Sequence, residues 1–343
     1  KWWLAKFPSH DLYGSSGSGS GGQITFEVAR CADTLTERNC YWQETQLVAM
    51  LPPLETSEAI MQMKSTSLAF DRIIWICGFA ETDRYATKKI LEDLEPLCAG
   101  NGIACSVHFV SSAEEAVDIL KRATGQPIVH LEMHGDKTLG LRVDPKGDFI
   151  SWEQLYSLLQ RINVAMMNRL LVVSACCYGL RSIMQIQLAQ PAPYKVLLAP
   201  EETVTHGEIL NGTLPFYREL FLNREINAAH AKGLTQLQYL HCEKLLFEAI
   251  VRYRLESCVG KGKASRIERL VSEAREDQQV RHGLPIRTIR RMLKRKIRTS
   301  SGPRLLKKYT TSFLMGEPAS FTSMDIDRAV DTRIQAKSRG KLL

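Results

Sequence analysis

Two stretches decide the fold of this chain: Ile128-Val-His-Leu-Glu-Met-His134-Gly135 and, some forty residues later, Leu170-Leu-Val-Val-Ser-Ala-Cys176-Cys177-Tyr-Gly179. Each is an apolar run, rich in β-branched residues, that stops at a reactive side chain followed closely by glycine. Such runs predict buried strands, and ligands of open α/β folds bind at the carboxyl ends of such strands. We therefore expect a histidine and a cysteine to meet at one edge of a sheet.

The residues around these stretches alternate between strand and helix patterns. Apolar strand signals recur at 72–79, 103–110, 127–134, 170–176 and 194–199, and amphipathic helices are predicted between them. Ser112 with Glu115, and Ser151 with Gln154, form helix-capping boxes, and Thr213-Leu-Pro215 predicts the start of a later helix. The pattern predicts an α/β fold with a mostly parallel sheet sandwiched by helices.

The sequence divides into three parts. Residues 1–66 are weakly patterned and contain a Gly/Ser linker at 14–22, which either replaces a loop between two strands or tethers residues 1–13 as a peptide. Residues 67–234 carry the α/β pattern. Strand signals stop after Gly233, so we expect residues 235–343 to form a helical, basic C-terminal extension.

Composition excludes several classes of protein. The chain has 343 residues, 44% of them apolar, and its apolar runs are far shorter than the roughly 20 residues of a membrane helix. Nine scattered cysteines, with no CxxC pair, fit reduced thiols better than a disulfide framework or a zinc site. We expect a cytoplasmic protein without a membrane segment, a metal or a cofactor.

The two strand ends suggest thiol chemistry. A thiol attacks a carbonyl group as the thiolate, so it needs a base nearby and hydrogen-bond donors for the oxyanion. His134 is the candidate base, and the N–H groups of Gly135 and of the cysteine itself are the candidate donors. The alternative is a strand that merely ends in a buried cysteine and a buried histidine.

At these residues the chain resembles the caspase-like cysteine peptidases, and among them the CHAT domains. His134-Gly135 and Ala175-Cys176-Cys177-Tyr-Gly179 match the family's histidine and cysteine motifs, and residues 139–155 are similar to its hairpin and following helix. The resemblance covers about half the chain, from Arg72 to Gly233. It implies a caspase-like fold and a regulated cysteine endopeptidase of a bacterial defence or cell-death module, which cleaves a specific protein partner.

The doublet requires a choice between two thiols, because consecutive strand residues face opposite ways. The family spacing, with the cysteine three residues before the glycine, indicates Cys176 as the nucleophile and leaves Cys177 as a packed core thiol. His130 shares a strand face with His134, so it either orients the site or is a core histidine.

Four residues near the predicted cleft are candidates for substrate binding: Asp136, Glu201, Glu202 and His206. The three acids could pair with an Arg or Lys at the cleaved position, which favours cleavage after a basic or neutral residue. Each of them could equally be a solvated surface charge, and His206 could be a surface-loop residue.

The positive charge lies in the C-terminal part. Residues 252–343 hold 23 Lys/Arg against 9 Asp/Glu, so the net charge of +8 comes from this segment alone. A stripe of this kind could follow a phosphate backbone, dock an acidic partner or cover the acidic half of the same chain. The basic helix predicted at 286–298 carries the candidates for nucleic-acid contact: Arg287, Arg290, Arg291, Lys294, Arg295, Lys296 and Arg298. An alternative function is therefore a catalytically silent caspase-like module that binds a protein or nucleic acid through these helices.

Overall fold

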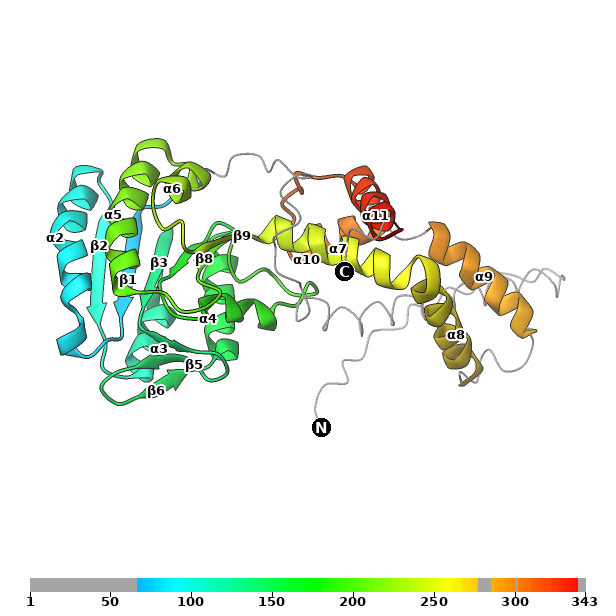
Figure 1. The fold of residues 1–343 in the computed structure, drawn as a ribbon, viewed down its shortest axis with the longest axis horizontal. Helices are drawn as coiled ribbons and strands as arrows, with labels where there is room; N and C mark the ends of the chain where they lie inside the picture. The colour runs from blue at the N-terminus through cyan, green and yellow to red at the C-terminus, as the bar shows by residue number, and fades with distance from the viewer. Residues whose placement is uncertain (1–66, 277–284, 300–301, 339–343) are drawn as a thin grey trace, which may run out of the picture.

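A central sheet organises the computed structural model, which describes residues 67–276, 285–299 and 302–338 (Figure 1). The strand order is β2-β1-β3-β7-β8-β9, and every neighbouring pair is parallel except β8 and β9. The prediction of an α/β fold with a mostly parallel sheet is confirmed. The strands are β1 (Arg72–Cys77), β2 (Ala104–Phe109), β3 (Pro127–Glu132), β7 (Leu171–Ser174), β8 (Val196–Ala199) and β9 (Gln238–His241).

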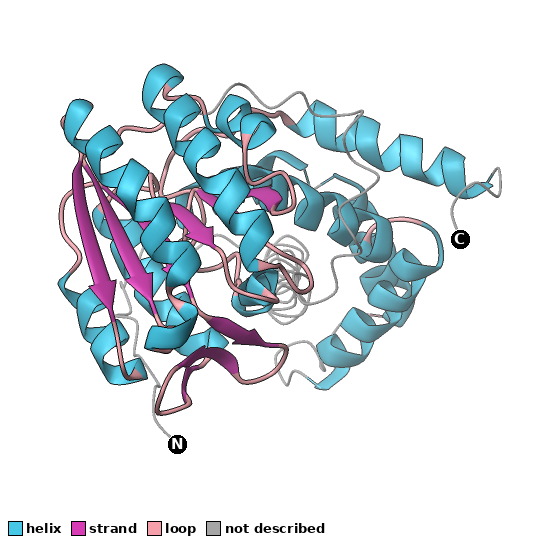
Figure 2. Ribbon diagram, turned by 60° about the vertical axis from the view of Figure 1, so that its left-hand side comes forward, coloured by secondary structure: helices cyan, strands magenta, loops and turns pink. Residues whose placement is uncertain are grey.

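Helices cover both faces of this sheet (Figure 2). Because strand side chains alternate between faces, Ile73 and Trp75 of β1 enter one apolar cluster and Ile74 and Ile76 enter another. The first cluster includes α2 (Tyr85–Gly100), α5 (His206–Asn223) and α6 (Ile226–Lys232), and the second includes α3 (Ala113–Arg122) and α4 (Trp152–Ala165). The serine half of each predicted capping box is present, since the Ser112 and Ser151 side chains accept hydrogen bonds from the N–H groups three residues on. The Glu115 carboxylate accepts from the N–H of Ser111 and not from that of Ser112, so the first box is not reciprocal.

One predicted helix start was wrong. Helix α5 begins at His206 and holds Pro215 in its interior, where Thr213-Leu-Pro215 was expected to open it. A capping box between Thr205 and Glu208 fixes the true start, because each side chain accepts from the other residue's backbone N–H.

A second, three-stranded antiparallel sheet follows β3 directly. Its strands are β4 (His134–Asp136), β5 (Gly140–Val143) and β6 (Asp148–Ile150), in the order β4-β5-β6. Leu141, Val143 and Ile150 of this sheet are buried in the same apolar cluster as α3 and α4. The expected hairpin between the two motifs is therefore present and is packed onto the domain.

The C-terminal part is helical, but it does not begin where the strand signals were expected to stop. β9 lies beyond residue 234 and completes the main sheet, so the boundary at 234 was wrong as a limit of the sheet. The residues after β9 form α7 (Cys242–Ser257), α8 (Gly260–Glu276), α9 (Ile286–Thr299), α10 (Gly302–Ser312) and α11 (Ser323–Ser338).

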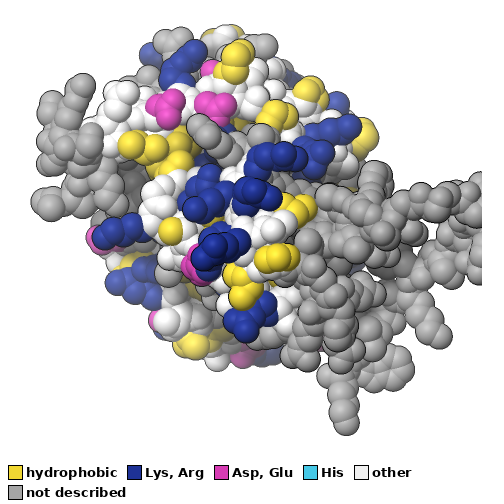
Figure 3. All heavy atoms as spheres, turned by 90° about the vertical axis from the view of Figure 1, so that its right-hand side faces the viewer, with side chains coloured by type: hydrophobic (Ala, Val, Ile, Leu, Met, Phe, Trp, Pro, Cys, Tyr) yellow, Lys and Arg dark blue, Asp and Glu magenta, His cyan; other side chains and the backbone are white. Residues whose placement is uncertain are grey.

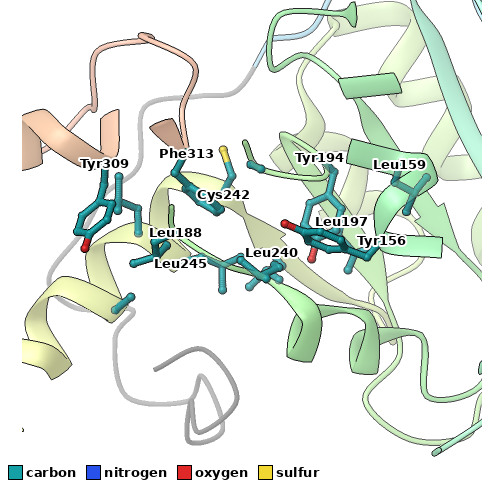
Figure 4. Packing of buried hydrophobic residues seen from close by; sticks show 14 of the residues in the cluster. Tyr156, Leu159, Leu188, Tyr194, Leu197, Leu240, Cys242, Leu245, Tyr309 and Phe313 are labelled. Carbon is teal, nitrogen blue, oxygen red and sulfur yellow. The ribbon is translucent and has the colours of Figure 1, made fainter. Parts of the chain in front are cut away.

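The sheet and the C-terminal helices share one core. Leu197 of β8 and Tyr156 of α4 belong to the same buried apolar cluster as Leu245 of α7 and Phe313, which directly follows α10 (Figure 4). Lys195, next to β8, adds a buried ion pair: its Nζ lies 2.5 Å from Glu317 Oε1 and 3.6 Å from Glu243 Oε1.

Residues 1–66, and with them the expected N-terminal strands and the 14–22 linker, lie outside the described residues. Within the described ranges, no helix has the length and the apolar character needed to cross a membrane.

Candidate active site

The two sequence motifs meet at the carboxyl edge of the main sheet. β3 and β7 are parallel neighbours, with His130 opposite Val173 and Leu131 opposite Ser174, and the chain continues past each strand into its motif. The contact is closest at Gly135: a Cβ atom built there would lie 1.8 Å from the carbonyl oxygen of Cys177 and 2.8 Å from its carbonyl carbon. Only a residue without a side chain allows this approach. The backbones of the histidine motif and the cysteine motif are thereby in direct contact.

His134 opens β4 and is held on two sides. Its Nε2 lies 3.2 Å from Asp144 Oδ2, and its ring meets the edge of Phe79 at 5.0 Å between centroids. Arg142 also pairs with Asp144, with 3.3 Å between Arg142 Nε and Asp144 Oδ1. Burial, followed by the positive charge of Arg142, lowers the pKa of His134, and Asp144 opposes this shift. A lowered pKa favours the neutral imidazole, which is the form a general base needs.

The two thiols have different surroundings. Cys176 is 0% exposed, its Sγ donates to the carbonyl oxygen of Leu131 at 3.3 Å, and burial raises its pKa to about 12. Cys177 is half-buried, and its Sγ lies 3.8 Å from the carbonyl oxygen of Val204. A thiol sealed in the core and held protonated cannot offer a thiolate to a peptide. The burial of the doublet is thus the opposite of that expected: Cys176 is the core thiol, and Cys177, expected in the core, is the more accessible of the two.

The turn after the doublet is tightly constrained. Tyr178 has a left-handed backbone, with φ of 59°, and its N–H donates to the carbonyl oxygen of Glu202 at 2.8 Å. Gly179 packs under the turn, where a Cβ would lie 2.6 Å from Ser174 Oγ. The residues that follow β8 therefore hold the cysteine turn through backbone hydrogen bonds, and a strained backbone of this kind is typical of functional sites.

The four predicted substrate-binding residues are not equally suited to that role. Asp136 Oδ1 accepts hydrogen bonds from the N–H groups of Thr138 and Leu139 at 2.7 and 2.8 Å, and these bonds lower its pKa. Its carboxylate is therefore engaged in forming its own turn. Glu201 and Glu202 have exposed side chains after β8 and are available to a ligand.

His206 lies closer to the site than its sequence position indicated. It is the first residue of α5, and its ring lies 4.9 Å from the ring of Phe79, which also contacts His134. Phe79 is thus an apolar contact shared by both histidines. The sequence did not indicate this role, because a phenylalanine at the end of a strand is ordinarily a core residue.

His130 is a core residue. Its ring stacks on Trp75 at 3.5 Å, its Nδ1 is 2.9 Å from the Tyr217 hydroxyl, and burial lowers its pKa to about 3. Next to it, Glu132 accepts hydrogen bonds from Trp75 Nε1 and from the Thr87 hydroxyl, and burial raises its pKa to about 7. Both side chains lie inside the sheet rather than in the cleft.

Sequence reasoning missed Asp144 altogether. It lies in the turn between β5 and β6, where an acid ordinarily indicates only a solvated loop. Its position relative to His134 depends on the pairing of His134 with Arg142 across β4 and β5, which cannot be read without the register of the hairpin.

The basic helix α9 lies far along the chain from this site and packs on α8. Arg290 forms two hydrogen bonds with Glu268 at 2.8 and 2.6 Å, and Arg287, Arg291, Lys294 and Arg295 are exposed. The side chains of Lys296 and Arg298 lie outside the described part of the structure.

Together the site holds an imidazole 3.2 Å from a carboxylate, a half-buried thiol and a glycine in close backbone contact. In the described ranges, no group of three or more His, Cys, Asp or Glu side chains could hold a metal ion. This set of residues suits nucleophilic attack by a thiol.

No protein-family model matches the chain, and no curated protein matches it either.

Proposed function

We propose that this chain is a caspase-like cysteine endopeptidase in which Cys177 is the nucleophile and His134 the general base. The contact between Gly135 and Cys177 is the observation that carries the proposal, because it brings the backbone of the histidine motif against that of the cysteine motif. The mostly parallel sheet flanked by helices is compatible with the family resemblance of the two motifs.

In the proposed reaction, His134 takes the proton of the Cys177 thiol and the thiolate attacks the carbonyl carbon of the peptide bond. Since Nε2 of His134 is held by Asp144, Nδ1 is the nitrogen left for the thiol. The tetrahedral oxyanion accepts hydrogen bonds from the N–H groups of Gly135 and Cys177. His134 then gives its proton to the leaving amine, and water hydrolyses the thioester to release the acid and restore the thiol.

Asp144 is the proposed positioning residue for His134. A carboxylate 3.2 Å from one imidazole nitrogen favours the tautomer with the proton on that nitrogen and stabilises the imidazolium that forms during the reaction. The ion pair between Arg142 and Asp144 holds that carboxylate in place in turn.

The proposed substrate is a specific protein partner of a bacterial defence or cell-death module, cut after a basic or neutral residue. Glu201 and Glu202 are the acids available to such a residue, since their side chains are exposed near the cysteine turn. A mixture of fluorogenic peptides with Arg, Lys, Ala or Asp at the cleaved position separates the possibilities. Turnover of the Asp peptides alone would contradict this preference.

The decisive experiment compares four variants with the native chain on candidate partner proteins and on the peptide mixture. Cys177→Ala should abolish cleavage, His134→Ala should slow it by about 10²- to 10⁴-fold, and Cys176→Ala should leave it largely intact. Asp144→Asn should lower the turnover number by at least about tenfold and shift the pH profile, because the tautomer and the orientation of His134 are no longer fixed.

The opposite pattern, with loss of cleavage in Cys176→Ala but not in Cys177→Ala, would restore the sequence-based choice of nucleophile. If the native chain cleaved no partner and no peptide, the proposal of a peptidase would be wrong, and the silent binding module would be the better description.

A further inference from the structure

A basic groove lies between α8 and α9, at the end of the molecule away from the peptidase site. It has a volume of about 520 Å³, a floor that includes Ala264 and Ile267, and a rim of four cationic side chains: Lys263, Arg291, Lys294 and Arg295. Figure 3 looks onto this end of the molecule, where Lys and Arg side chains gather with only a few acids between them.

Packing between the two helices fixes the position of these cations. Ile289, Leu293 and Ile297 of α9 are buried in the same cluster as Ile267 and Leu270 of α8. The opposite side of α9 must therefore face outward with its basic residues. Arg290 lies opposite Glu268, and the later turn of α9 lies beside the first turns of α8.

Three of the four rim cations have no ion-pair partner within the described residues. Glu268, the acid closest to the groove along α8, is paired with Arg290, and this bond, together with the positive charges of Arg290 and Lys294, lowers the pKa of that carboxyl. Among the described residues, Lys263, Arg291 and Lys294 form no ion pair with an acid. The sequence left open that α9 docks onto the acidic half of the same chain. Within the described structure, these three cations form no ion pair with that half.

We propose that this groove binds the phosphodiester backbone of a single nucleic-acid strand. Arg287, Arg291 and the neighbouring pair Lys294 and Arg295 recur once per helical turn, at a pitch of about 5.4 Å, so α9 presents a row of charges rather than one point charge. A row of this kind matches a polymer of phosphates, and guanidinium groups bind phosphate oxygens in a bidentate manner. A groove volume of about 520 Å³ suits the backbone of one strand better than a whole duplex.

The apolar floor supports the same occupant. Ala264 and Ile267 give the groove a surface against which a sugar or a base can pack, while the rim holds the phosphates. Aromatic side chains do not line the groove, so binding should depend on charge and should tolerate different sequences.

Fluorescence anisotropy with a labelled single-stranded 20-nucleotide oligonucleotide tests this inference on the full chain. Arg291→Glu with Lys294→Glu should raise Kd at least about tenfold at 100 mM salt, and it should reduce the slope of log K against log salt by about 1.4 for two lost phosphate contacts. The matched control is Arg304→Glu with Lys307→Glu on α10, which makes the same change in charge at exposed positions and should leave Kd unchanged.

Two further variants keep the test independent of folding and of the peptidase site. Arg291→Gln with Lys294→Gln, checked by circular dichroism, should weaken binding in the same direction but less than charge reversal. Cys177→Ala should bind as the native chain does. The inference is overturned by absent or salt-independent binding of the native chain, by an equal loss in the α10 control, or by displacement of the oligonucleotide by polyglutamate of equal charge as efficiently as by unlabelled oligonucleotide.

Discussion

Replacing Gly135 by alanine is the most direct perturbation of the contact between the two motifs. The new Cβ would lie 1.8 Å from Cys177 O, whereas such atoms are not found closer than 3.0 Å, so the two backbones must separate by about 1.2 Å. Overpacking of this size costs about 1–3 kcal/mol of unfolding free energy. For a domain of this length we expect a decrease in Tm of between a few degrees and about 10 °C.

The same displacement should also disturb the chemistry. A misplacement of about 1 Å in a catalytic site can lower the rate by about 10²-fold. Cleavage of a peptide by Gly135→Ala should therefore fall by about that factor. The rate of alkylation of Cys177 by iodoacetamide, followed by mass spectrometry, should also change because the thiol moves relative to His134.

Gly100→Ala is the matched control. Gly100 ends α2, and a Cβ built there meets nothing within 4 Å, so its stability should stay within about 0.5 kcal/mol of the native chain. If Gly135→Ala unfolds at the same temperature as the native chain and alkylates at the same rate, the close approach of the two motifs is wrong.

Three further experiments, one labelling reaction and two substitutions, test other parts of the structure. In the native chain, iodoacetamide should label Cys177 and not the buried Cys176, which should react only after unfolding in urea. Burial raises the pKa of Glu132 from 4.5 to about 7, so the folded state keeps its proton in a pH range where the unfolded state has lost it. The native chain should therefore lose about 3 kcal/mol of unfolding free energy as the pH rises from about 4.5 to 7. Glu132→Gln should remove this pH dependence. Lys195→Ala should cost about 3–5 kcal/mol in urea unfolding, since it leaves Glu243 buried without its cation.

Each of these has a clear contrary outcome. Equal labelling of both thiols under native conditions would show that Cys176 is accessible. A Glu132→Gln chain with the same pH dependence as the native chain would place the titrating group elsewhere. Arg328→Ala removes an exposed ion pair on α11 and should cost less than about 1 kcal/mol, so an equal cost for Lys195→Ala would contradict the burial of the Lys195 pair.

The sequence predicted the parallel strands well because their signals are local. Buried runs such as Ile73–Cys77 are continuous, and the Ser112 and Ser151 caps mark the helices that follow. β9 escaped prediction because Gln238–His241 is only four residues long and runs directly into α7, so its pattern merges with the periodicity of that helix. Its place in the sheet comes from its partner β8, which is a non-local cause.

The expectation that Cys177 is the packed core thiol was wrong for a different reason. Alternation of side chains holds within a strand, but β7 ends at Ser174, and both cysteines lie in the turn beyond it. There the left-handed backbone of Tyr178 and its bond to Glu202 O shape the turn, so the alternation rule does not predict which thiol is buried. For α5 a local signal did exist, because Thr205 and Glu208 have the spacing of a capping box. Pro215, a residue common at helix starts, indicated a later start instead.

The shared core has a consequence for dissecting the chain experimentally. Truncation after residue 234 would remove β9, expose the backbone edge of β8 and strip α7 from the apolar cluster that contains Leu197 and Tyr156. The α/β part and the C-terminal helices should therefore unfold in one cooperative transition, and limited proteolysis should not release a stable fragment ending at that point. Variants at either end of the molecule should therefore be made and assayed in the intact chain.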